Sequence, residues 1–172
     1  MDQVLLLLHI QPHNMIKHIS NFKFDGKENV ENFLRQNRIL YTKHSLLSGG
    51  VSTYSCAANL FKDVFFKNFC ERIISLTDKY PIDMWSNIGY PGTYVKPHKH
   101  YSERYPNAIS GVYYLQKPTD SGNLVIEGDV INVKSGDLVL FGDTEMHWTE
   151  KNESNKDRIV ISFNLHNLCY NT

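Results

Sequence analysis

Three histidines and one arginine are the residues of this sequence whose types and spacing could do chemistry. His98 and His100 are separated by one residue, His147 lies far downstream, and Arg158 follows His147 with ten residues between them. Neutral imidazole is a strong ligand for Fe, Zn, Cu and Ni. Two histidines at positions i and i+2 of a strand point to the same side, so both can reach one ion. The pattern therefore indicates a metal site built from two separated segments.

The segment that follows Arg158 predicts a strand with two different faces. One face is entirely apolar and the other is mixed; the two sets are Ile159, Ile161, Phe163 and Leu165, and Arg158, Val160, Ser162 and Asn164. We expect the apolar face to pack under a helix and the mixed face to look into the interior of the sheet structure. Burying an arginine side chain costs free energy unless an anion or a carboxylate accepts hydrogen bonds from its guanidinium. Arg158 is thus predicted to bind a carboxylate.

The residues after Pro81 predict the scaffold that positions these side chains. Short strands alternate with turns rich in Gly, Pro, Asn and Asp. The predicted strands are 83–90, 94–100, 109–116, 123–127, 129–133, 137–141, 146–150 and 158–165. Eight short strands at this spacing are typical of an antiparallel sandwich or barrel of the jelly-roll kind. We therefore expect a mainly β fold with flanking helices.

The first part of the chain predicts helices. Apolar residues keep helical spacing over 57–79, which predicts a helix that covers the outer face of the sheet, and a second helix is predicted over 27–41. A chain of 172 residues is long enough for one domain with a substantial core. We expect a single domain, 1–172, in which 1–80 is a mostly helical support region and 82–166 is a jelly-roll catalytic core.

Composition narrows the class of partner. Lys plus Arg and Asp plus Glu both total 18, so no overall basic field attracts nucleic acid or a membrane. The apolar run 5–8 is too short for a membrane span and lacks the basic start and cleavage site of a signal peptide. Cys56, Cys70 and Cys169 form no metal-binding spacing, as expected for idle thiols in a reducing compartment. We expect a cytoplasmic protein without a membrane partner, and the overall charge gives no clear nucleic-acid signal.

The combined order of these motifs resembles that of the iron(II)- and 2-oxoglutarate-dependent oxygenases. The matching pieces are Trp85 with Asn87, His98 to His100, 109–115, 121–124, 133–141, His147 and 158–164. The segments "SGVYYL" and "SGDLVLF", with the later "RIVISFN", are particularly similar to a small group of oxygenases found in bacteria and their phages. The resemblance covers about half of the chain, from Met84 to Leu165, and it implies a double-stranded β-helix (jelly-roll, cupin-like) core.

The resemblance also implies an activity and roles for particular residues. In that family His-x-Asp/Glu and a distal His hold Fe(II), and a basic residue about ten positions later binds the far carboxylate of 2-oxoglutarate. Carried onto this chain, His98 and His147 are iron ligands and Arg158 binds the cosubstrate. The implied function is a dioxygenase, most simply a hydroxylase, that couples decarboxylation of 2-oxoglutarate to oxidation of a small molecule or a protein side chain by O₂.

One departure from the family pattern concerns the second ligand, because His100 stands where the carboxylate is usual. Iron held by three neutral imidazoles, His98, His100 and His147, is the first reading. In the second, Glu103 from the following loop supplies the acidic ligand. In the third, His100 only borders the site.

Two other classes remain compatible with the sequence. A cupin would use the three histidines together with Glu103, bind Mn, Fe, Ni or Zn, and need no 2-oxoglutarate; the position of Arg158 is what a cupin does not require. A jelly-roll binding module without metal is the non-enzymatic alternative, and it predicts no stoichiometric iron after anaerobic reconstitution.

Overall fold

The computed structural model describes residues 16–55 and 59–167. The apolar run 5–8, Cys56 and Cys169 lie outside the described residues, whereas Cys70 is a buried free thiol. Within the described ranges, no helix has both the length and the apolar composition needed to cross a membrane.

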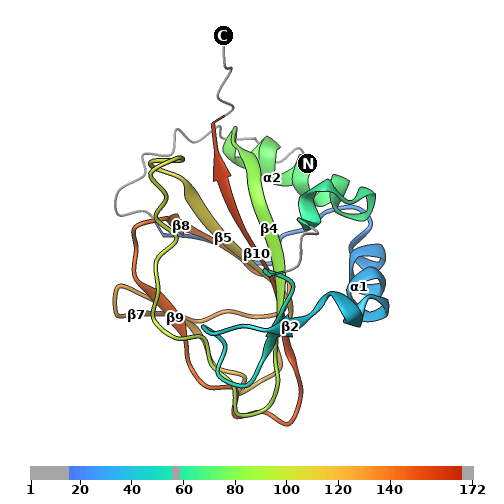
Figure 1. Ribbon diagram of the computed structural model, residues 1–172, viewed down its shortest axis with the longest axis vertical. Helices are drawn as coiled ribbons and strands as arrows, with labels where there is room; N and C mark the ends of the chain where they lie inside the picture. Colours follow the sequence, from blue (N-terminus) through green and yellow to red (C-terminus); the bar gives the residue numbers. More distant parts are fainter. Residues whose placement is uncertain (1–15, 56–58, 168–172) are drawn as a thin grey trace.

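Two antiparallel sheets form the centre of the molecule (Figure 1). The large sheet contains, in spatial order, β1 (Lys17–Ile19), β8 (Leu138–Gly142), β5 (Ile109–Gln116), β10 (Arg158–His166), β4 (Tyr80–Gly89), β3 (Val51–Ser52) and β2 (Thr42–Lys43). The small sheet contains β7 (Asp129–Ile131), β6 (Leu124–Ile126) and β9 (His147–Thr149). The prediction of a mainly β fold with flanking helices and a double-stranded β-helix core is confirmed.

The large sheet has an apolar layer on each face because its strands alternate in side-chain direction. On β10 and β5, the side chains of Ile161, Phe163 and Tyr113 belong to the core that faces the helices. Val112 and Tyr114 belong to a second core that faces the small sheet. The two faces predicted for the last strand are therefore confirmed.

Helices α1 (Lys27–Gln36) and α2 (Lys67–Thr77) cover the outer face of the large sheet, on the side away from β7 and β9 (Figure 1). Phe69 of α2 packs edge-on against Phe163 of β10, with ring centroids 5.7 Å apart. The predicted covering role of this helix is confirmed, but its predicted extent over 57–79 is wrong. Asp63 is extended and its side chain accepts a hydrogen bond from the backbone N–H of Phe65, so a separate 3₁₀ turn begins there.

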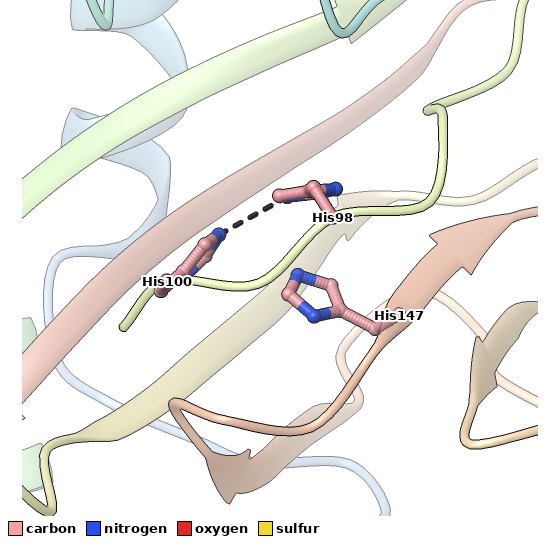
Figure 2. Close-up of side chains that lie close together, drawn as sticks. All are labelled: His98, His100 and His147. Carbon is pink, nitrogen blue, oxygen red and sulfur yellow. Dashed lines mark hydrogen bonds between the residues drawn. The ribbon is translucent and has the colours of Figure 1, made fainter. Parts of the chain in front are cut away.

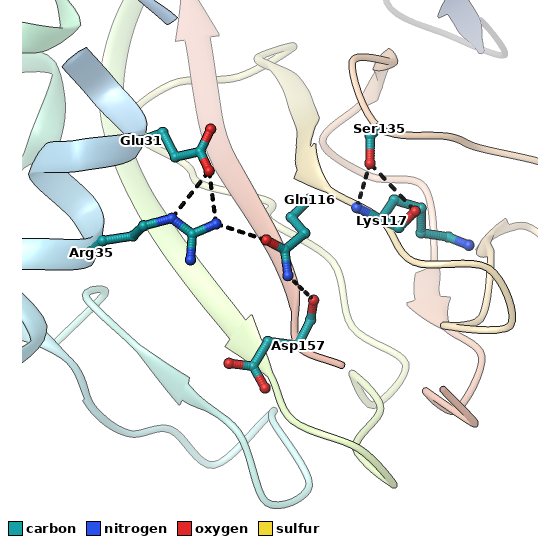
Figure 3. Close-up of polar contacts among 6 residues, drawn as sticks. All are labelled: Glu31, Arg35, Gln116, Lys117, Ser135 and Asp157. Carbon is teal, nitrogen blue, oxygen red and sulfur yellow. Dashed lines mark hydrogen bonds and ion pairs between the residues drawn. The ribbon is translucent and has the colours of Figure 1, made fainter. Parts of the chain in front are cut away.

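Polar contacts fasten α1 to the end of the sheet (Figure 3). Arg35 donates to Glu31 one helical turn earlier, at 2.7 Å, and to the side chain of Gln116 on β5, at 2.8 Å. Gln116 in turn donates to the backbone carbonyl of Asp157, 2.7 Å away, just before β10. The remaining helical turns in the described first part are the 3₁₀ turns η1 (Arg38–Leu40), η2 (Leu60–Lys62) and η3 (Val64–Phe66).

The strand predicted over 94–100 is wrong. This segment forms only isolated bridges, one between Val95 and Leu47 and one between His98 and His147. Pro97 interrupts the segment, and proline has no N–H to donate to a strand ladder. The short strands β1, β2 and β3 were not predicted, since two or three residues are too few to show an alternating pattern.

Gly111 is expected to be the glycine of this sheet that least tolerates a side chain. A Cβ at this position would overlap the ring of Phe163 and lie 3.0 Å from Leu140. We expect Gly111→Ala to lower the free energy of unfolding by about 1–3 kcal/mol through overpacking, measured by urea denaturation. Combining it with Phe163→Leu should recover part of that loss, and a strictly additive double variant would contradict this explanation.

Candidate active site

A cavity of about 620 Å³ lies between the two sheets. Its lining includes the side chains of His98, His100 and His147 together with Arg158, so the structure brings together the four residues that the sequence singled out. Apolar side chains of the inner core, among them Phe141, complete the wall. The resulting pocket combines an apolar surface with a few convergent polar groups, as ligand sites usually do.

The three imidazoles converge on one point (Figure 2). One ring nitrogen of each lies within 4.8 Å of the others, and Nε2 of His98 is 3.1 Å from Nε2 of His100. His98 and His147 are brought together by a pair of backbone hydrogen bonds, each 3.0 Å long, between the irregular segment and β9. A single bridge, rather than the strand predicted over 94–100, therefore places His98, and with it His100, opposite His147.

Hydrogen bonds at Nδ1 determine which ring nitrogen of His98 and of His147 is available. Nδ1 of His98 lies 2.8 Å from the carbonyl of Lys96, and Nδ1 of His147 lies 3.0 Å from the carbonyl of Glu145. A carbonyl only accepts, so both Nδ1 atoms carry the proton and both Nε2 atoms present a lone pair. Nδ1 of His100 is likewise occupied, by the side chains of Ser110 and Asn164. Three such nitrogens suit a divalent transition metal.

Burial keeps the cluster uncharged. Burial, together with the neighbouring imidazoles, lowers the pKa of His147 to about 3 and that of His100 to about 4. Burial also lowers the pKa of His98. All three rings are therefore neutral near pH 7, which is the protonation state in which imidazole binds a metal.

His147 should make the metal-free protein sensitive to mild acid. Its pKa is about 3 when folded and about 6.5 when unfolded, so the unfolded chain binds more protons between these values and stability falls as the pH drops through 6.5. We expect the free energy of unfolding to be about 2 kcal/mol lower at pH 5 than at pH 7 from this residue alone. Urea denaturation at both values tests this, and His147→Gln should show a correspondingly smaller difference. Equal pH dependence in both proteins would contradict the expectation.

Arg158 is buried, with 3% of its surface exposed, at the start of β10. Its guanidinium donates to the carbonyls of Ser121 and Glu150, the latter at 3.2 Å, and to the hydroxyl of Thr149 at 2.7 Å. No ion pair among the described residues joins it to a carboxylate. Burial lowers the pKa of Arg158, whereas Tyr114 and Glu150 favour the charged form. Arg158 forms no salt bridge with the nearby Asp157 or Glu153.

Tyr114 is a cavity residue that the sequence reasoning missed. Its side chain is fully buried, lines the cavity, and has a hydroxyl without a hydrogen-bond partner within the described part of the chain. Burial raises the pKa of Tyr114, so the hydroxyl is protonated and able to donate. The alternation of β5 was the available signal, because Tyr114 shares its face with Ser110 and Val112, opposite Tyr113.

Glu103, the alternative acidic ligand, lies apart from the cluster. It is exposed and is neither in the lining of the cavity nor among the groups that converge with the imidazoles. Ser162, which shares the face of Arg158, does line the cavity. Trp85 also lines it and packs edge-on against His100, with ring centroids 5.5 Å apart.

Comparison with known proteins identifies the architecture. No protein-family model matches the sequence, and a search of curated proteins finds no match in sequence. Several solved structures do match in fold. A prolyl-4-hydroxylase from Pseudomonas putida is 14% identical, with a TM-score of 0.63 over 88% of this chain and 91% of that chain.

Two further structures agree. HygX from Streptomyces hygroscopicus, with nickel, 2-oxoglutarate and hygromycin B bound, is 12% identical, with a TM-score of 0.67 over 90% of this chain and 84% of that one. A prolyl hydroxylase from Trichoplax adhaerens, in complex with a hypoxia inducible factor peptide, is 15% identical, with a TM-score of 0.66 over 90% and 84%. The chain thus has the double-stranded β-helix fold of these solved structures.

Proposed function

We propose that this protein is an Fe(II)- and 2-oxoglutarate-dependent dioxygenase that hydroxylates its substrate. The observation that carries the proposal is the buried guanidinium of Arg158, without a carboxylate partner among the described residues, in the same cavity as three imidazoles. A buried cation of this kind calls for an anionic ligand. The likeness in fold to 2-oxoglutarate-bound structures supports the proposal independently.

Each residue has a defined part in this proposal. His98, His100 and His147 hold the iron through Nε2, and Arg158 binds the far carboxylate of 2-oxoglutarate. The unpartnered hydroxyl of Tyr114 donates to the same carboxylate. Bound iron supplies the activation of O₂ that protein side chains cannot provide. The apolar wall of the cavity excludes water from the reacting groups.

We infer that the substrate is a small molecule or a protein side chain that enters between exposed aromatic residues. Tyr54 and Tyr101 line the cavity yet are 55% and 59% exposed, so they mark its opening. Neighbouring structures hold ligands of both kinds, hygromycin B in one case and a peptide in another. O₂ is the second cosubstrate in this proposal.

A cupin-type metal protein that does not use 2-oxoglutarate is the alternative. It would take Glu103 as a further ligand, and this side chain is exposed and outside the cluster. It would also leave the buried guanidinium of Arg158 without an anionic partner among the described residues. Both observations favour the oxygenase.

Succinate formation is the deciding experiment, because uncoupled turnover requires no knowledge of the substrate. The protein is loaded with Fe(II) under anaerobic conditions, mixed with 2-oxoglutarate and exposed to air. We expect succinate from the iron-loaded protein and none from the metal-free protein. Stoichiometric metal without succinate would favour the cupin, and the absence of stoichiometric metal would favour a binding module.

A further inference from the structure

The three imidazoles differ in what holds them. Nδ1 of His98 and Nδ1 of His147 each lie next to a backbone carbonyl. A carbonyl can only accept a hydrogen bond, so both Nδ1 atoms must donate. His100 instead faces two side chains, with Nδ1 3.0 Å from the hydroxyl of Ser110 and 2.9 Å from Oδ1 of Asn164. Both partners can donate as well as accept, so they do not by themselves determine where the proton of His100 lies.

The orientation of one amide therefore decides the tautomer of His100. With Oδ1 of Asn164 toward the ring, Nδ1 carries the proton and Nε2 presents a lone pair. With the NH₂ group toward the ring, Nδ1 accepts and the proton moves to Nε2. An Nε2 proton would donate a hydrogen bond to the lone pair of Nε2 of His98, 3.1 Å away, and would occupy the lone pair that a metal needs. The contact with Asn164 must therefore outweigh this competing hydrogen bond.

Asp83 lies on the other side of Asn164 and can select between the two orientations. The two residues are paired across β4 and β10. One carboxylate oxygen, Oδ1 of Asp83, accepts the backbone N–H of Asn164 at 3.1 Å, and the side chain of Asn164 lies close enough to lower the pKa of that carboxyl. An ionised carboxylate only accepts, so it attracts the NH₂ group of the amide and leaves Oδ1 for His100.

Other features of Asp83 fit this role. Burial raises the pKa of Asp83, whereas its hydrogen bonds to Asn164 lower it. Among the described residues no lysine, arginine or histidine forms an ion pair with it. Asp83 is half-buried and has no cationic partner among the described residues, so Asn164 is its stabilising contact. No ion pair therefore competes with the NH₂ group of Asn164 for this carboxylate.

We propose that Asp83 is a positioning residue for the metal site: it orients the amide of Asn164, which holds His100 in the Nδ1-protonated tautomer and leaves Nε2 free to bind the metal. Ser110, whose hydroxyl donates to Oδ1 of Asn164 at 2.9 Å, supports the same orientation. The inference rests on the metal site of the proposed function. It extends that site to a carboxylate two hydrogen bonds away from the ligand.

Asp83→Asn is the first test. Oδ1 at this position is held by the backbone N–H of Asn164, so the introduced NH₂ group faces the Asn164 side chain and favours its flip. Histidine ring ¹⁵N NMR of the metal-free protein should show His100 Nδ1-protonated in the wild type and shifted toward the Nε2-protonated form in the variant. The affinity for Ni(II), measured by calorimetry, should fall about 10- to 100-fold. An unchanged tautomer or an unchanged Ni(II) affinity would overturn the proposal.

A swap of the two side chains keeps the test decisive if the single variant folds poorly. In Asp83→Asn with Asn164→Asp, a carboxylate that can only accept stands next to His100, and an amide stands behind it. We expect the swap to restore the Nδ1-protonated ring and most of the Ni(II) affinity. A swap that binds Ni(II) no better than Asp83→Asn alone would overturn the proposal.

The matched control is Asp129→Asn, the same chemical change at an exposed position of β7. It should leave both the tautomer of His100 and the Ni(II) affinity at wild-type values, and a comparable loss in this control would count against a specific role for Asp83. The NMR measurement needs neither iron nor 2-oxoglutarate. A failure to form succinate would therefore contradict the proposed function without affecting the test of Asp83.

Discussion

Arg158→Ala is expected to weaken the apparent affinity for 2-oxoglutarate by about 100-fold or more. Truncating one partner of a buried, hydrogen-bonded charge pair costs about 2–5 kcal/mol, and about 1.4 kcal/mol corresponds to a factor of ten. The guanidinium is 3% exposed, so little water can replace it. Succinate formation as a function of 2-oxoglutarate concentration, with the iron-loaded protein, measures the effect.

Two further variants separate charge from geometry at this position. Arg158→Lys keeps a positive charge but loses the planar fork, so we expect an affinity between those of the wild type and the alanine variant. Arg38→Ala removes an exposed arginine of η1 and should leave the affinity unchanged. A wild-type dependence on 2-oxoglutarate in a folded Arg158→Ala protein would refute the assignment.

His100→Ala is expected to lower the affinity for Fe(II) or Ni(II) by about 100-fold or more and to reduce succinate formation to background. Outer-shell partners of metal ligands typically contribute about 10- to 100-fold to affinity, so a ligand should reach at least the upper end of that range. His100→Asp replaces one ligand type by another and should retain metal binding. Calorimetric titration with Ni(II) distinguishes the variants.

His100→Ala and His100→Asp together distinguish a metal-binding His100 from a His100 that only borders the site. If this residue only bordered the site, His100→Ala would lower the Ni(II) affinity by less than about 100-fold, as the loss of an outer-shell partner does. His166→Ala is the control, since this histidine lies at the end of β10 and hydrogen-bonds to backbone carbonyls outside the cluster. A similar loss in both alanine variants would show that the effect is not specific to the cluster.

Periodic patterns made the later strands predictable. Strands β5, β8 and β10 place alternate side chains in two different cores, and this alternation is visible along the chain. The segment around His98 was mispredicted as a strand because its composition resembles one, whereas only one bridge to His147 forms. The helix predicted over 57–79 was too long because the helical spacing of apolar residues continues through the two 3₁₀ turns before α2. Asp63, which is extended, separates these turns.

The candidate site was predicted in part. Its histidines and arginine stand out by type and spacing, and the structure places all four in one cavity. Tyr114 and Asn164 were harder to find, because a tyrosine or an asparagine in a strand is ordinary in any sequence. Tyr114 is distinguished by a hydroxyl that has no partner among the described residues, and Asn164 by its contact with His100. Both features exist only after folding.

The amino-acid sequence by itself determined the chemical types of the site and the direction in which the last strand presents them. Alternation along a strand is a local property, so Arg158 and Asn164 had to share a face wherever that strand was placed. The tertiary structure alone decided which side chains meet. Asp83 contacts Asn164 because β4 pairs with β10 in one register, and His98 meets His147 through a single bridge between distant segments. Such contacts depend on pairing between strands far apart in the chain, which no local pattern specifies.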